Sequence, residues 1–328
     1  MKKLGNPSTV NKLGFGTLIF GLILILSCCK PKTSEKLTNP KEFTTPLEKV
    51  YSLSIPSEKL LQQFEEAKTA YEKEPDNPDL LIWYGRRKAY LGHYQEAIDI
   101  YTEGIKKFPE DARIYRHRGH RYISIREFDK AINDLSKASE LIEGKPNEIE
   151  PDGMPNAQNI PVSTLHGNIW YHLGLAYYLK QDFENAYKAY LKCRESGSKD
   201  DNLVSSTHWL YMIQRRLGNK SAADSLLQPI TRELKIIENM SYHKLCLFYK
   251  GLLSEEELLP KGESSSASDA VAYGLANWYL VEGQDEKGLK LMRQIVEGPN
   301  WSSFGYIAAE SDLLDKLEDA TITLENKQ

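Results

Sequence analysis

One segment in the first half of the chain has residue types dense enough to do chemistry. Residues 112–126 (ARIYRHRGHRYISIR) hold five arginines and two histidines. His117 and His120 are three positions apart, so on a helix they share a face, as two metal ligands would. Neither an HExxH motif nor a clear third ligand accompanies them, so we predict no metal site and no cofactor. A guanidinium instead binds a carboxylate through two parallel hydrogen bonds, and we expect this segment to bind anions.

The histidines leave an enzymatic alternative open. A hydrolase or transferase site would combine His117, His120, Arg121, His172 and His208 with Glu150 and Asp152. The sequence has no P-loop, no dinucleotide glycine fingerprint and no nucleophile elbow beside these residues. We therefore expect a binding protein and no enzymatic activity.

Two cysteines lie in apolar helical surroundings. We expect Cys193 and Cys246 to be buried, unreactive thiols. A disulfide between them in an oxidising compartment stays open.

The composition is that of an ordinary globular chain. Its 328 residues are 41% hydrophobic and 27% charged, with a formal net charge of −4. These values exclude collagen-like, coiled-coil and largely disordered proteins. A near-neutral charge also argues against binding to nucleic acid.

The amino-terminal residues are typical of an export signal. Residues 13–26 (LGFGTLIFGLILIL) form an uncharged run that is shorter than the about 20 apolar residues of a membrane-spanning helix. The run ends in Leu26-Ser27-Cys28, which resembles a bacterial lipobox. The resemblance implies a signal peptide at 1–27, lipid on Cys28, and a lipid-anchored place in the bacterial cell envelope, on the periplasmic side or the outer membrane. Cys29 is a second candidate acceptor, and a short uncleaved anchor is the alternative.

The next segment is predicted to be a tether. Residues 28–56 are rich in proline, lysine, threonine and serine and poor in apolar residues. Such a composition does not bury enough surface to order itself. We expect a flexible link between the lipid and the folded body.

A repeat of 34 residues follows. Gly85 and Gly119 are separated by this interval, as are Ala97 and Ala131. A third copy aligns Trp170, Leu173, Gly174, Tyr177, Ala186 and Tyr190 at the same offsets. The pattern resembles the tetratricopeptide repeat. Small residues in it let two helices approach closely, and bulky residues fill the space between neighbouring pairs.

The resemblance implies an all-α, right-handed solenoid of antiparallel helix pairs over residues 57–328. We predict pairs at 78–108, 112–142 and 167–195, weaker copies after them, and a capping helix near the carboxyl end. Two segments lack a helical period, a proline-rich insertion at 143–164 and a polar linker at 261–268.

In tetratricopeptide arrays the first helix of each pair lines a concave groove. Carried over position by position, the predicted groove residues are Arg86, Arg116, His120, Asn168, Tyr171, His208, Arg215, Tyr273 and Asn277. Their chemistry suits a protein or peptide partner that bears a carboxylate. We expect protonation of His120 and His208 near pH 6.5 to strengthen binding of an anion.

The role of the insertion is left open between three possibilities. Its acids Glu148, Glu150 and Asp152 could neutralise Arg116 and Arg121. It could also be a lid over the groove or an idle loop.

Capture of a glycan or nutrient is a further alternative function. It requires Trp170, Trp209 and Trp278 to be exposed as stacking platforms.

Overall fold

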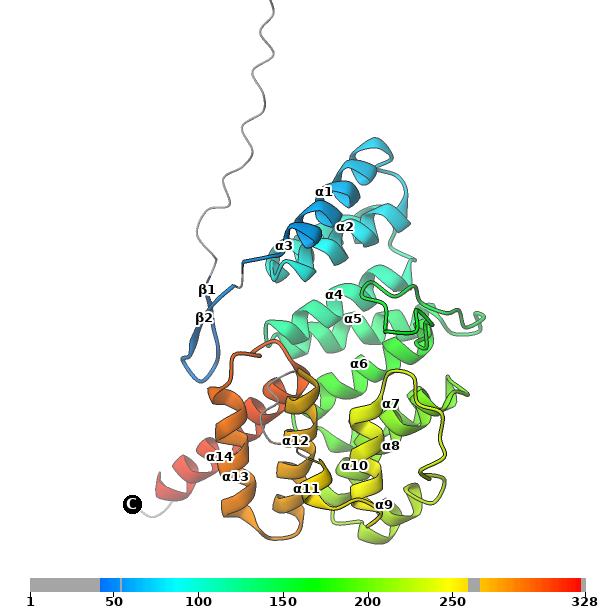
Figure 1. Ribbon diagram of the computed structural model, residues 1–328. Helices are drawn as coiled ribbons and strands as arrows, with labels where there is room; N and C mark the ends of the chain where they lie inside the picture. The colour runs from blue at the N-terminus through cyan, green and yellow to red at the C-terminus, as the bar shows by residue number, and fades with distance from the viewer. Residues whose placement is uncertain (1–41, 54, 259–265, 326–328) are drawn as a thin grey trace, which may run out of the picture. The chain divides into compact units, whose positions relative to one another are not determined.

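The computed structural model describes residues 42–53, 55–258 and 266–325, and their regular secondary structure is almost wholly helical (Figure 1). The expected signal peptide and Cys28 lie outside this part of the chain. Among the described helices, none is both long enough and apolar enough to cross a bilayer.

Three successive helix pairs occupy the predicted positions. They are α2 (Pro78–Tyr90) with α3 (Tyr94–Lys107), α4 (Ala112–Ser124) with α5 (Phe128–Leu141), and α6 (Leu165–Leu179) with α7 (Phe183–Glu195). Each helix packs on the next one along the chain, as repeats that bury their apolar faces on neighbours must do. The predicted all-α repeat fold is confirmed.

Close packing within each pair rests on one glycine of the first helix. A Cβ at Gly85 would lie 2.4 Å from the Tyr101 ring, and one at Gly119 would lie 2.7 Å from Leu135. The third copy repeats this contact between Gly174 and Tyr190. In every copy the bulky partner comes sixteen positions after the glycine, which confirms the register read from the sequence.

The turn inside each pair confirms two weaker copies. These are α8 (Asp200–Arg216) with α9 (Lys220–Leu226), and α12 (Ser266–Val281) with α13 (Asp285–Glu297). In five turns the second residue has a positive φ angle, namely Gly92, Arg126, Gln181, Gly218 and Gly283. The left-handed conformation costs a non-glycine residue about 1 kcal/mol or more, so Arg126 needs compensating contacts.

The remaining helices flank or interrupt the pairs. They are α1 (Glu58–Lys73), α10 (Met240–Tyr249), α11 (Glu255–Leu258) and α14 (Phe304–Glu325). The last of these matches the predicted capping helix. Because α12 already begins at Ser266, the expected linker at 261–268 ends earlier than predicted, and its residues 261–265 lie outside the described chain.

The expected flexible tether is partly folded, which corrects the prediction for its second half. Strands β1 (Glu42–Thr44) and β2 (Val50–Ser52) pair antiparallel, with Phe43 opposite Tyr51. The Phe43 ring stacks on Trp301 with centroids 4.4 Å apart, and Tyr51 Oη donates to the carbonyl of Val296 at 3.2 Å. Contacts with residues some 250 positions away order a segment whose own composition does not.

The carboxyl-terminal helices pack on the first helices of earlier pairs. Helix α14 contacts α6, α12 and α13, and α12 contacts α8 (Figure 1). Two buried ion pairs fix α14, Arg126 Nε to Glu310 Oε2 at 2.7 Å and Arg216 Nη2 to Asp312 Oδ2 at 2.5 Å. The first of these compensates the left-handed backbone at Arg126.

Candidate ligand-binding site

The insertion at 143–164 folds back on itself beside the first three pairs. The N–H of Glu150 donates to the carbonyl of Ser163 at 3.0 Å, and Ile149 forms an isolated bridge with Thr164. The stretch between these contacts has neither helix nor strand. Side chains of other elements must therefore hold it in place.

Arginines of α2 bind the insertion through its backbone carbonyls. Arg86 Nη1 donates to the carbonyl of Pro151 at 2.8 Å, and Arg87 Nη1 to that of Gly153 at 3.0 Å. A Cβ at Gly153 would lie 1.9 Å from the hydroxyl of Tyr90, so a larger residue there requires the Tyr90 side chain to move. Residues 151–153 thus lie against α2.

The Glu150 carboxylate enters the basic segment singled out in the sequence. It is 8% exposed and lies 3.2 Å from Arg116 Nε and 3.3 Å from His117 Nε2. Asn168 Nδ2 of α6 donates to it at 2.8 Å. We call Glu150, Arg116, His117 and Asn168 the Glu150 cluster. The expected neutralisation of Arg116 by an acid of the insertion occurs here.

Burial sets the protonation of the histidines in this region. Desolvation, and then the charge of Arg116 or Arg121, lowers the pKa of His117, His120 and His172 well below its usual value. The expected protonation of His120 near pH 6.5 is therefore wrong for this structure. Desolvation also lowers the pKa of Arg116, and the nearby Glu150 opposes that shift.

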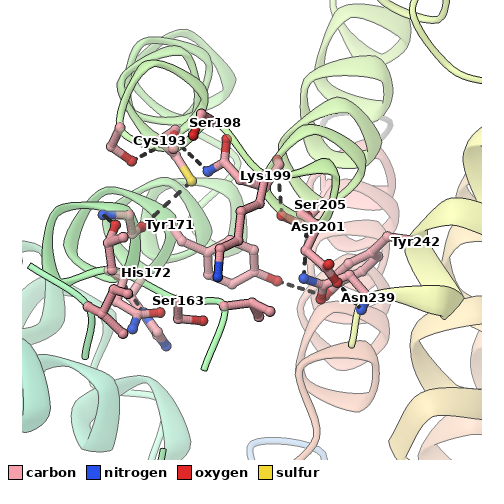
Figure 2. Close-up of a pocket in the computed structure, with 18 of the residues that line it drawn as sticks. Ser163, Tyr171, His172, Cys193, Ser198, Lys199, Asp201, Ser205, Asn239 and Tyr242 are labelled. Carbon is pink, nitrogen blue, oxygen red and sulfur yellow. Dashed lines mark hydrogen bonds between the residues drawn. The ribbon is translucent and has the colours of Figure 1, made fainter. Parts of the chain in front are cut away.

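A cavity of about 470 Å³ opens next to the Glu150 cluster (Figure 2). Helix α6 contributes Asn168, Tyr171 and His172 to its wall, and the start of α10 contributes Tyr242. The hydroxyls of Tyr171 and Tyr242 share a hydrogen bond of 2.7 Å, which ties the two helices together. Ile149 lies at the rim and is 57% exposed. The cavity combines an aromatic wall with amide and hydroxyl groups.

The turn between α7 and α8 supplies the charged side of the cavity. The Lys199 side chain reaches into it (Figure 2), and its ammonium donates to the carbonyl of Pro161 at 2.9 Å. The Asp201 carboxylate is buried and accepts the backbone N–H groups of Glu238 and Asn239 at 2.8 Å. Asp201 thus positions the loop before α10, whereas the Lys199 ammonium has further N–H groups besides the one that Pro161 accepts.

The structure divides the nine predicted groove residues into three sets. The first set is Arg86, Arg116 and Asn168, which meet at the insertion. The second set is Tyr171, which lines the cavity, and His120. His120 lies between His172 and Phe304, with ring centroids 4.3 and 5.3 Å away.

The third set lies inside the body. His208 is 1% exposed and stacks on Tyr242 of α10, and burial lowers its pKa to about 3. The expected protonation of His208 near pH 6.5 is therefore wrong as well. Arg215 pairs with Glu282 at 2.7 Å.

Tyr273 and Asn277 complete this third set. Both residues are 1% exposed, and Asp312 of α14 accepts the hydroxyl of Tyr273 at 2.9 Å. Helices α10 and α14 cover α8 and α12, which are the first helices of the two weaker copies. The repeat pattern alone does not reveal this covering.

The structure bears on the enzymatic site, the tryptophan platforms, the cysteine pair and the metal site that the sequence raised. His208 stacks among aromatic rings of α10, away from the pairing of His117 with Glu150. Trp209 is 2% exposed, so it offers no stacking platform. Cys193 and Cys246 are free and buried, and burial raises the pKa of the Cys193 thiol to about 12. Among the described residues, no three His, Cys, Asp or Glu side chains converge as metal ligands.

Sequence reasoning missed Lys199, Asp201, Asn239 and Tyr242 of the cavity. Tyr242 belongs to a segment too degenerate to align with the repeat. A local signal at Asp200-Asp201 marks the start of α8, because acids favour the first turn of a helix.

A family model of the tetratricopeptide repeat matches residues 167–195, which are the third pair. The third pair is thus a tetratricopeptide repeat, and the described fold is tetratricopeptide-like.

Several known proteins are similar to this tetratricopeptide-like chain. The BBSome complex member BBS4 of Bos taurus is 26% identical over 138 residues, which are 42% of this chain and 22% of that protein. This chain thus matches less than a quarter of that relative's length.

Solved structures also resemble it. A tetratricopeptide repeat protein from Parabacteroides merdae has a TM-score of 0.46 at 18% identity, covering 77% of this chain and 92% of that one. YrrB, described as a TPR protein with an unusual peptide-binding site, has a TM-score of 0.41 at 14% identity, covering 76% and 98%.

Proposed function

We propose that this protein is a lipid-anchored binding protein of the bacterial cell envelope, which presents its first-helix surface to a protein or peptide bearing a carboxylate. It acts by binding, without catalysis. Tetratricopeptide folds generally serve as scaffolds for protein interactions, and analogy of fold supports that coarse role here. The finer statement depends on the site.

The observation that carries the proposal is the cavity beside the Glu150 cluster. It is built from first-helix residues Asn168 and Tyr171, and the cationic Lys199 reaches into it. Next to it, Arg116 and Asn168 already hold a carboxylate, that of Glu150. The chemistry that would recognise an acidic peptide is thus present at one surface.

Reversing the charge in the cavity tests the proposal. Envelope extract is passed over immobilised protein carrying Lys199→Glu, an exposed position whose change spares the core. We expect the recovery of a bound partner to fall at least about tenfold, because one attractive charge becomes repulsive. Lys192→Glu makes the same change of net charge on α7 and serves as the control, since Lys192 does not line the cavity. Equal recovery with both variants would show that the cavity is not the site.

The anchor is tested separately. Cys28→Ala should remove the lipid label and move the protein out of the membrane fraction, because one acyl-bearing residue provides the attachment. Cys29→Ala, one residue further on, should change neither. Loss of the label in the Cys29 variant alone would move the acceptor to that residue.

A further inference from the structure

The insertion contacts the first-helix surface as a bound peptide would. Its Glu150 side chain is held by Arg116, His117 and Asn168, and its backbone carbonyls accept from Arg86 and Arg87. Three of these five partners are predicted groove residues, contributed by the first helices of three successive pairs. Recognition of one anchoring side chain together with backbone groups is how folded domains bind extended peptides.

The positive charge of this surface exceeds the negative charge that the insertion brings to it. Arg86, Arg116 and Arg121 act together on the buried groups here, since all three lower the pKa of His117. Glu150 is the buried carboxylate opposite them, and Asp152 beside it is partly exposed. The surface therefore keeps attraction for a further acidic group.

Little apolar packing holds the insertion down. Ile149, Met154 and Ile160 are 57%, 68% and 41% exposed, whereas Val162 near its end is buried. Burial of large apolar side chains stabilises a fold, and the insertion leaves three of them largely in solvent. Apolar packing therefore does little to oppose displacement of this segment.

We propose that residues 149–153 (Ile-Glu-Pro-Asp-Gly) are a built-in competitor for the groove, and that an extended acidic peptide of the partner binds by displacing them. This proposal rests on the proposed function, and it adds a ligand type and a means of regulation. The partner segment carries a glutamate or aspartate that replaces Glu150, and its backbone carbonyls accept from Arg86 and Arg87. The free protein keeps its site closed until such a segment arrives.

The chain's own sequence supplies the probe. A fluorescent peptide of residues 147–155 (NEIEPDGMP) is titrated with the full chain and followed by anisotropy. In the unaltered protein the tethered copy has an effective concentration of about millimolar or higher, so the free peptide binds weakly. Glu150→Gln weakens the tethered copy alone, and we expect the free peptide to bind that variant about tenfold tighter or more.

Two controls locate the effect. Glu148→Gln makes the same charge change at an exposed residue of the insertion and should leave the weak binding as it is. Adding Arg116→Ala to Glu150→Gln should abolish the gain, because the peptide glutamate loses its arginine. If Glu150→Gln fails to fold, Glu150→Asp keeps the charge, shortens the reach and takes its place.

The outcomes separate this proposal from the proposed function. Peptide binding that is equally weak in the folded Glu150→Gln variant and in the unaltered protein would overturn the built-in competitor. The probe is a segment of this chain, so the result does not depend on finding a partner. Tight binding to the variant, combined with equal recovery by the Lys199 and Lys192 variants, would count against the cavity as the partner site and leave the competitor in place.

Discussion

Two of the buried arginine–carboxylate clusters in the described part of the chain differ in the element that carries the carboxylate. In one, Glu150 of the insertion pairs with Arg116. In the other, Glu310 of helix α14 pairs with Arg126, and Asp312 pairs with Arg216 nearby. All of these carboxylate side chains are at most 8% exposed, so the clusters are nearly alike in chemistry and burial.

What lies behind each carboxylate is different. Helix α14 buries a row of apolar residues around its acids, namely Tyr306, Ile307, Ala308, Ala309 and Leu313. The insertion leaves most of its apolar side chains in solvent. A buried ion pair by itself contributes little net stability, because the cost of desolvating both charges offsets their attraction. We conclude that the apolar contacts decide which carboxylate is locked and which one is displaceable.

The largest expected effect tests the locked cluster. Glu310→Ala leaves Arg126 buried without its partner, and breaking such a pair costs about 3–5 kcal/mol. Urea unfolding followed by circular dichroism measures this loss. Glu127→Ala is the control, because Glu127 pairs with Lys130 on the surface and should cost less than about 1 kcal/mol. Similar losses from both variants would mean that α14 is not locked by its acids.

The next effect is on acid sensitivity. His208 has a folded pKa of about 3, below its ordinary value of 6.5, so the unfolded chain binds a proton that the folded chain refuses. Its contribution is therefore fully present above pH 6.5 and is lost as the pH falls towards 3. The slope is about 1.4 kcal/mol per pH unit for one such group.

Urea titrations at several pH values between 6.5 and 4.5 measure this slope. His208→Gln should reduce this slope by about 1.4 kcal/mol per pH unit, the contribution of one proton, since Gln does not titrate. His117 is the comparison, because the proposed displacement of the insertion beside it would let it take up a proton at smaller global cost. An unchanged slope in the His208 variant would show that this histidine is protonated in the folded state.

The smallest expected effect on global stability comes from the displaceable cluster. Glu150→Ala should cost only about 1 kcal/mol of unfolding free energy, because the insertion moves away and lets water reach Arg116. Amide exchange in residues 149–164 should accelerate, while exchange in α14 stays slow. A loss as large as that of Glu310→Ala would remove the distinction between the two clusters.

The sequence allowed the pairs to be predicted because their pattern is local. Gly85 and Tyr101 meet within one pair, so residue spacing alone fixes their contact. The same frame placed Arg86, Arg116 and Asn168 on one surface, and the acids of the insertion pointed to a partner for Arg116.

Contacts between distant segments set the limit of prediction. The frame puts His208 and Asn277 on the groove side, yet α10 and α14 cover them. Likewise, Phe43 is ordered by Trp301, a residue that no local pattern near the tether could indicate. These partners depend on how later helices fold back, which requires the tertiary structure.

The β1–β2 hairpin has a consequence for the order in which this chain folds. Lys49 donates to the carbonyl of Val296 across 247 residues, whereas repeat arrays otherwise rely on neighbouring contacts. Closing so long a loop in an unstructured chain would cost about 5 kcal/mol of entropy. Stacked helices remove most of that cost beforehand, so the hairpin docks after the array has assembled. During synthesis it must wait for Trp301 to leave the ribosome, and fluorescence of that indole would report the final step of folding.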